Sequence, residues 1–419
     1  MAQDNTKSRT FKEMMWVASS KIFTMLVLFL CNVFVARACG TADFALYATC
    51  ITLVLLIDGV LGAPLDQTII RFGVRNNNDV DQSHRMTSTL FKIKLLLGVI
   101  VIIAAALLAK PISVLLFSDV SHYRLVVIVS CAVLALFASR CVSTFLQLEL
   151  NFRGYGMLDI LQGLFRLLFL GLLIYFSVIN INYFVCAFGL GSAFAFLIMV
   201  KKIPTKYMFS TWATSSERGE LIGFSLAVCG GLMLSTLTGR SDIIILSALQ
   251  STDTVAPFAV ATQFCMLLAM PAFYAGLVVQ PRILSISKEG KLPNLVKWSV
   301  LGGLISGAML VLFTFLFGQY IIYTIFGEAY TDAIHVLRIL IIGVMLDYIT
   351  MPVLLIFSLQ KFPKKVFKGE LVITIFFLGA AFLCAAESGI LLAWAVTAIR
   401  FLKLLFYFYI TFTNMRRVV

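Results

Sequence analysis

The sequence predicts an all-α membrane protein of about twelve transmembrane helices, and two observations support this. Hydrophobic residues make up 61% and charged residues only 13% of the 419 residues, whereas a water-soluble chain of this length needs far more charge on its surface. Apolar runs of about 18–24 residues recur along the whole chain, and each is long enough to cross a hydrocarbon core of roughly 30 Å.

Each predicted span is an apolar run bounded by polar or charged residues. The first run follows the polar segment 1–15, and no small-residue cleavage site comes after it, so we expect it to serve as both targeting signal and helix. The twelve spans are predicted at 16–37, 42–63, 88–109, 123–146, 157–178, 181–201, 220–245, 253–279, 295–317, 333–357, 366–385 and 388–411.

Lysine and arginine are concentrated at the chain ends and in alternate connections, where Lys92 and Lys94 are counted with the loop before the third span. The other connections hold little basic charge beyond Arg37, Lys110 and Arg124. By the positive-inside rule both termini are predicted to be cytoplasmic, which requires an even number of spans. Because basic loops report topology, the net charge of +13 is no evidence for nucleic-acid binding.

No connection exceeds roughly 25 residues, so no soluble domain is expected on either face. No GxxxxGK[ST] loop is present to hold nucleotide phosphates, which excludes ABC-type ATPase chemistry in this chain. The nine cysteines show neither CxxC nor Cys/His spacing, so no disulfide framework, metal site or cofactor is predicted. We therefore expect a protein that is not an enzyme.

The two halves of the chain resemble each other at an offset of about 210 residues. The segment 44–48 (FALYA) opens the second span and 255–259 (VAPFA) opens the eighth; 116–119 (LFSD) precedes the fourth span and 325–328 (IFGE) precedes the tenth. Six spans per repeat predict two parallel six-helix lobes, at 1–200 and 220–419, joined by a cytoplasmic linker at 201–219. In such folds the substrate site lies between the lobes in a central cavity.

Ionisable residues inside spans are costly and are therefore candidates for function. The predicted substrate-binding cations are Lys21, Arg140, Arg166, Arg240, Arg338, Arg400 and Lys403. The predicted ion-coupling carboxylates are Asp58, Asp242 and Asp347, and Asp159 lies close to the start of the fifth span.

Two readings of these charges stay open. They can snorkel or pair with each other, as Arg240 and Asp242 could. Alternatively, if they line a shared cavity, the excess of cations suits a diphosphate or an acidic sugar, because such groups need several charge-assisted hydrogen bonds. A carboxylate such as Asp58 or Asp347 could then couple transport to a gradient of H⁺ or Na⁺.

Several segments together resemble the Wzx-type polysaccharide flippases of the multidrug/oligosaccharidyl-lipid/polysaccharide (MOP) exporter superfamily. The resemblance covers essentially the whole chain. The segments are 36–47 (ARACGTADFALY) with Gly59, Gly62 and 70–71 (IR); 240–246 (RSDIIIL) with 255–263 (VAPFAVATQ); and 325–330 (IFGEAY) with 336–340 (VLRIL).

The resemblance implies a twelve-helix, two-lobed fold in a bacterial inner membrane. Its substrate would be an undecaprenyl-diphosphate-linked oligosaccharide, such as an O-antigen or exopolysaccharide repeat unit of the kind used in lipopolysaccharide biosynthesis. The protein would move it from the cytoplasmic to the periplasmic leaflet by ion-coupled alternating access. A polysaccharide polymerase and a chain-length regulator would be its partners.

Two alternatives remain. One is another exporter of the same superfamily, such as a multidrug antiporter or a peptidoglycan-precursor flippase, although the excess of cations argues against export of cationic drugs. The other is a membrane-embedded glycosyltransferase or polymerase, which would normally carry a long extracytoplasmic loop that this sequence lacks.

Overall fold

The structure is a computed structural model, and it describes residues 2–75, 80–203, 211–288, 292–358 and 363–415. The described chain is built from helices and forms two compact units, Met1–Ile244 and Ile245–Val419. The boundary between the units falls inside one long helix, α9 (Ser215–Leu249). The lobe limits that the sequence suggests, at 200 and 220, stay a prediction.

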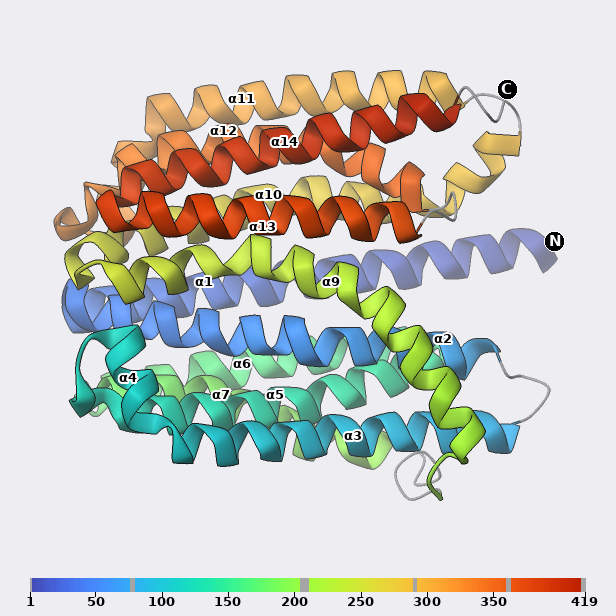
Figure 1. Cartoon of the computed structure of the whole chain (residues 1–419), viewed down its shortest axis with the longest axis horizontal. Helices are drawn as coiled ribbons and strands as arrows, with labels where there is room; N and C mark the ends of the chain where they lie inside the picture. The colour runs from blue at the N-terminus through green and yellow to red at the C-terminus, as the bar shows by residue number, and fades with distance from the viewer. Residues whose placement is uncertain (1, 76–79, 204–210, 289–291, 359–362, 416–419) are drawn as a thin grey trace. The chain divides into compact units, whose positions relative to one another are not determined.

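The N-terminal unit holds six membrane-crossing segments and the larger part of α9 (Figure 1). Among its helices, α1 packs on α6, α5 packs on α7 and α3, and α6 packs on α7. Its elements before α9 are α1 (Ala2–Ile57), the π-helical η1 (Asp58–Gly62), α2 (Ala63–Arg75), α3 (Val80–Leu107), α4 (Ala109–Phe117), η2 (Val120–His122), α5 (Tyr123–Leu148), α6 (Phe152–Tyr175), α7 (Ile181–Met199) and η3 (Val200–Lys202).

The C-terminal unit is arranged around α12, which packs on α10, α11 and α14, while α13 packs on α14. Its elements are α10 (Thr252–Lys288), α11 (Leu292–Phe326), η4 (Glu328–Tyr330), α12 (Ala333–Ser358), α13 (Pro363–Glu387) and α14 (Gly389–Met415).

Eleven helical segments of the described chain are long and apolar enough to cross a membrane. The first, Met15–Gly73, has 59 residues, or about 88 Å at 1.5 Å per residue, which is far more than one crossing needs. Gly40 interrupts it with φ 79° and ψ −178°, and Figure 1 shows the chain turning back there. Counted as two, its halves give the twelve predicted spans, and the protein is a multi-pass membrane protein.

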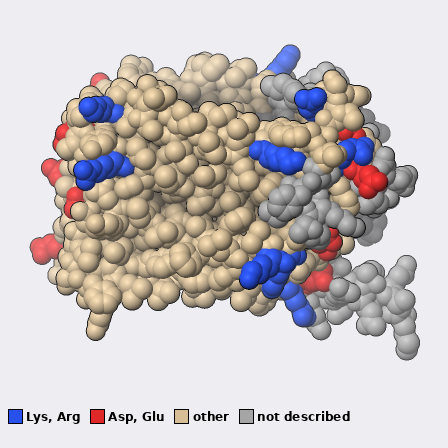
Figure 2. Space-filling model, turned by 90° about the horizontal axis from the view of Figure 1, so that it is seen from below, with Lys and Arg blue, Asp and Glu red and all other residues tan. Residues whose placement is uncertain are grey.

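The charged side chains visible in Figure 2 gather toward two opposite sides of the face, and most of the surface between them is uncharged. Many large apolar side chains of the described residues are exposed, for example Leu107 at 78% and Leu383 at 72%. Such exposure is favourable where the surrounding solvent is lipid.

The reversal at Gly40 needs glycine, because its φ and ψ lie in a region that is essentially restricted to residues without a Cβ. We expect Gly40→Ala to lower the free energy of unfolding by about 1–3 kcal/mol, measured as thermal unfolding in detergent. Gly171→Ala is the matched control, because Gly171 lies in α6 with open space around its Cβ position. Equal melting temperatures for the two variants would contradict the assignment.

The repeat predicted from 116–119 and 325–328 has a local structural counterpart. In the first segment Ser118 has a positive φ of 56°, and in the second Gly327 has a positive φ of 102°. Each is followed within two residues by a short 3₁₀ helix, η2 or η4, and then by a long helix, α5 or α12. The two sequence matches therefore each mark a break before a span, although ψ differs between them, 13° at Ser118 and 175° at Gly327.

Helix α9 begins with a capping box, in which the side chains of the first and fourth residues cap each other's backbone. The Thr214 N–H donates to Glu217 Oε2 at 2.7 Å, and the Glu217 N–H donates to Thr214 Oγ1 at 3.4 Å. Burial raises the pKa of Glu217, but hydrogen bonds from Arg85 and Thr214 outweigh it, so the pKa is lowered. The stability that this carboxylate adds is therefore present at neutral pH and is lost as the pH falls through its folded pKa.

Candidate functional site

Lys21 on α1 and Asp159 on α6 form an ion pair inside the N-terminal unit. Lys21 Nζ lies 2.6 Å from Asp159 Oδ2, and the two side chains are 23% and 11% exposed. The ammonium also lies 4.6 Å from the ring centroid of Tyr155. The first predicted cation thus has an acidic and an aromatic partner on a neighbouring helix.

Arg140 on α5 pairs with Asp58, the first residue of η1, at 3.5 Å between Nε and Oδ2. A π-helical segment inside an α-helix is uncommon and often marks a functional position. The Asp58 side chain is 6% exposed, and its second oxygen, Oδ1, is buried with no hydrogen-bond partner among the described residues. The Arg140 side chain is 40% exposed, more than those of Lys21, Arg400 and Lys403, which also form ion pairs with carboxylates.

Arg240 on α9 extends this group. It lies within electrostatic range of Asp242, Asp58 and Arg140, and Asp159 is also within electrostatic range of Arg140. Asp242 is 6% exposed, and its Oδ1 accepts a hydrogen bond from the N–H of the next residue, Ile243, at 2.8 Å. We call Lys21, Asp58, Arg140, Asp159 and Arg240 the N-terminal charge cluster.

The Arg166 side chain is buried and contacts α7. It is 6% exposed, and its guanidinium donates to Ser192 Oγ at 2.8 Å and to the Phe188 carbonyl at 3.3 Å. The guanidinium also lies 3.7 Å from the centroid of the Phe188 ring. In this structure Arg166 ties α6 to α7, and its predicted role in substrate binding stays a prediction.

Lys94 does not belong to a basic loop, so the prediction from the sequence is wrong. It lies inside α3 with 0% exposure, and its ammonium is 2.8 Å from both carboxylate oxygens of Asp66 on α2. Sequence reasoning missed this pair although a signal was present, since Lys94 falls within the predicted third span. Asp66 lies just beyond the predicted end of the second span.

In the C-terminal unit two predicted cations on α14 also have acidic partners. Arg400 Nη1 lies 3.2 Å from Asp347 Oδ2 on α12, and Lys403 Nζ lies 3.1 Å from Glu370 Oε2 on α13. Glu370 is 3% exposed and also accepts from the Tyr407 hydroxyl at 2.5 Å. Glu370 was missed as a site residue, although an acidic residue inside the predicted span 366–385 could have indicated it.

Arg338, the remaining predicted cation, lies near the start of α12 with its guanidinium 5.4 Å from the centroid of the Phe315 ring. Four of the seven predicted cations, Lys21, Arg140, Arg400 and Lys403, therefore form ion pairs with carboxylates. Pairing neutralises much of the positive charge that the sequence suggests. The cation best placed to bind an anion is one whose side chain remains exposed, and Arg140 meets this condition.

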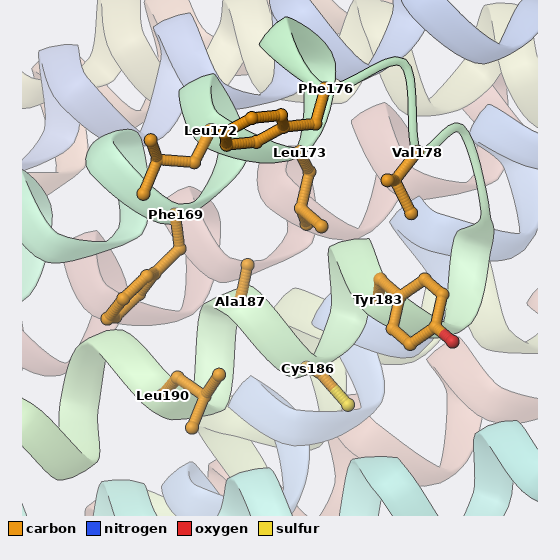
Figure 3. A pocket seen from close by; sticks show the side chains of 9 residues that line it. All are labelled: Phe169, Leu172, Leu173, Phe176, Val178, Tyr183, Cys186, Ala187 and Leu190. Atoms are coloured by element: carbon orange, nitrogen blue, oxygen red, sulfur yellow. The ribbon is translucent and has the colours of Figure 1, made fainter.

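A separate apolar groove lies where α6 and α7 join (Figure 3). It contains none of the predicted charged residues, and its walls suit hydrocarbon rather than a diphosphate. Among the described residues, no three of His, Cys, Asp and Glu come together as ligands for a metal ion. The groove is lined by Phe169, Leu172, Leu173, Phe176, Val178, Tyr183, Cys186, Ala187 and Leu190.

Comparison with protein families gives one match that covers most of the chain. Residues 10–287 match the family described as polysaccharide biosynthesis protein. The chain belongs to this family. A comparison with curated protein sequences found no match.

This polysaccharide biosynthesis protein has the fold of MOP superfamily transporters. An inward-facing MATE multidrug transporter aligns with a TM-score of 0.76 at 15% identity, covering 94% of this chain and 95% of the other. The lipid II flippase MurJ aligns with a TM-score of 0.76 at 12% identity, covering 94% and 87%. A MOP superfamily transporter from Pyrococcus furiosus aligns with a TM-score of 0.70 at 16% identity, covering 97% and 95%.

Proposed function

We propose that this protein flips an undecaprenyl-diphosphate-linked oligosaccharide, an O-antigen or exopolysaccharide repeat unit, from the cytoplasmic to the periplasmic leaflet. Membership of a polysaccharide biosynthesis family and the MOP transporter fold support transport of a lipid-linked sugar. The observation that carries the proposal is the N-terminal charge cluster, in which three cations, Lys21, Arg140 and Arg240, accompany two carboxylates.

The cations of the cluster can replace the hydrogen bonds that a diphosphate loses when it leaves water. A diphosphate carries several acceptor oxygens, and arginine can bind two of them with parallel N–H groups. Asp58 lies nearest the Nε of Arg140, so the terminal N–H groups of this guanidinium would bind the substrate. Arg240 would supply the second cation, and the polyprenyl tail would remain in the bilayer.

Ion coupling would use a carboxylate that shares its cation with the substrate. When a diphosphate binds the terminal N–H groups of Arg140, less of the guanidinium charge remains to compensate the nearly buried Asp58, and an under-compensated buried carboxylate is unfavourable. Uptake of H⁺ or Na⁺ by Asp58 would relieve this. Asp242 and Asp347 are the further candidates for coupling, and Arg166, Arg338, Arg400 and Lys403 for later contacts with the substrate as the protein changes conformation.

The proposal also includes the protein's location in the cell and its partner proteins. We place it in the bacterial inner membrane with both termini in the cytoplasm, as the distribution of basic residues predicts. It would act beside a polysaccharide polymerase and a chain-length regulator, which use the unit that it delivers.

Complementation of a flippase-null strain with matching sugar chemistry tests the function. Surface polysaccharide and the lipid-linked units left in the cytoplasmic leaflet are both measured. Restored polymer with cleared precursor is the expected result. Well-expressed protein without rescue would overturn the assignment of this substrate.

Arginine variants test the site. We expect Arg140→Gln or Arg240→Gln to lower the rate of flipping about ten- to a hundredfold, because each loses a charge-assisted hydrogen bond of about 1.5–3 kcal/mol. Lipid-linked precursor should accumulate in proportion. Arg124→Gln is the matched control, since Arg124 lies on α5 like Arg140 but is exposed beside Tyr123. Normal polymer in all three variants at equal expression would show that the cluster does not bind the substrate.

A further inference from the structure

The two ends of α9 are attached to different units. Its N-terminal part belongs to the N-terminal unit, where Thr236 packs on η1: its hydroxyl oxygen lies 3.5 Å from the Gly59 carbonyl oxygen, while the hydroxyl donates to the Leu232 carbonyl of α9 at 2.9 Å. Its last residues belong to the C-terminal unit, where the following residue, Gln250, donates from Nε2 to the carbonyls of Ala385 and Ala386, each at 2.9 Å. A rearrangement of the two units must therefore bend α9 or release one of its attachments.

The segment that leads into α9 is attached to one face of α3. The Ala213 N–H donates to Thr89 Oγ1 at 2.7 Å, and Arg85 Nη2 lies 3.0 Å from Glu217 Oε1. The Lys92 ammonium lies 5.2 Å from the centroid of the Trp212 ring. Positions 85, 89 and 92 are spaced by four and three residues, so these three contacts follow one stripe of the helix.

Two of these contacts, Arg85–Glu217 and Lys92–Trp212, can open to solvent, whereas the hydrogen bond from the Ala213 N–H to Thr89 is buried. The Arg85 side chain is 30% exposed and Trp212 is 54% exposed, so water and salt weaken both interactions. Ala213 is the residue of this segment that packs into the protein interior. It belongs to a buried apolar cluster with Ile69, Phe72, Met86, Leu90 and Leu221. By contrast the Lys94–Asp66 pair on the same helix is 0% and 13% exposed and is built to stay closed.

Release would leave the helix itself intact. Glu217 uses Oε1 for Arg85 and Oε2 for the Thr214 N–H that caps α9. Loss of the Arg85 contact therefore loosens the attachment of the segment to α3, which Thr89 still holds at Ala213, while the capping box continues to hold the first turn of α9. The two oxygens of Glu217 thus serve two independent contacts, one to α3 and one that caps α9.

We propose that residues 211–217 form a releasable latch that fixes the start of α9 to α3 in this conformation and opens when the transporter changes conformation. The latch goes beyond the proposed function, because it depends on a conformational change and not on which substrate is moved. It gives Arg85, Thr89 and Glu217 a role in positioning α9.

Spin labels at Thr211→Cys and Leu150→Cys test the latch, in full-length protein whose nine native cysteines are replaced. Both positions are exposed and lie in the N-terminal unit, so pulsed-EPR distances between them report the segment alone. Arg85→Glu or Arg85→Gln is expected to raise the population with the longer distance about two- to fivefold, the factor that a partly exposed ion pair is worth. Both variants leave the Glu217 cap of α9 in place, and Arg85→Lys, which keeps the charge, should stay nearer the native value.

Arg218→Glu is the matched control, because it makes the same charge change as Arg85→Glu on an exposed side chain next to Glu217. It should leave the distances unchanged. One distance population that neither Arg85→Glu nor Arg85→Gln alters would show a static contact and overturn the latch. Because the readout needs no substrate, a protein that shows the latch but fails to restore polysaccharide would contradict only the proposed function.

Discussion

Lys94→Met is expected to lower the free energy of unfolding by about 3–5 kcal/mol, because it leaves the Asp66 carboxylate inside the bundle without its cation. The native pair is bidentate, with both distances 2.8 Å, and Lys94 is fully buried. Thermal or denaturant unfolding in detergent measures the loss. Such a loss is a large share of the stability of an ordinary domain.

Two further variants test whether loss of the Lys94–Asp66 pair causes the lower stability of Lys94→Met. Lys92→Met removes a lysine two positions away that is only partly buried and contacts Trp212, so its effect should stay below about 1 kcal/mol. In Lys94→Met/Asp66→Leu the buried charge is gone, and much of the stability should return. Equal losses in the two single lysine variants would contradict a structural role for the pair.

Gly303→Val is expected to destabilise the C-terminal unit by about 3 kcal/mol, near the upper end of the cost of overpacking. A Cβ at this position would lie 2.4 Å from the Tyr348 carbonyl oxygen on α12, which is backbone and cannot rotate away. Helix α12 is also held from its other side, since the Tyr348 hydroxyl donates to the Leu268 carbonyl on α10 at 2.8 Å. The added methyl groups must therefore separate α11 from α12.

Gly302→Val provides the comparison one residue earlier on the same helix. Its Cβ position has open space around it, so no packing cost is expected, and valine is preferred over glycine in a helix. The melting temperatures of the two variants are compared in the same detergent. If both fall equally, the contact of Gly303 with Tyr348 is not what limits stability.

The membrane-spanning helices could be predicted because the bilayer imposes a length and an apolar composition on each crossing. The polar gap between the first two predicted spans, for example, coincides with the reversal at Gly40. The short matches at 116–119 and 325–328 likewise marked real turns, since both segments place a residue with positive φ before a 3₁₀ helix.

The partners of the charged residues could not be predicted in the same way. Hydropathy shows that Arg166 lies in a span but not which way the helix is rotated, and the structure turns it toward Ser192 on α7. Glu370 and Lys403 meet only because α13 and α14 pack in one particular register. Pair formation depends on rotation and register between helices, which a single sequence does not contain.

The ion pair between Lys21 and Asp159 has a consequence for biogenesis. The two residues are separated by about 140 positions, so at 5–20 residues per second the ribosome needs roughly 7–30 s after Lys21 to supply its partner. During that interval the first span must enter the bilayer with an unpartnered lysine or wait beside the insertion machinery until α6 emerges. Lys94, whose partner Asp66 precedes it by 28 residues, can pair as soon as it is made. The N-terminal span is thus the one whose insertion should depend most on later parts of the chain.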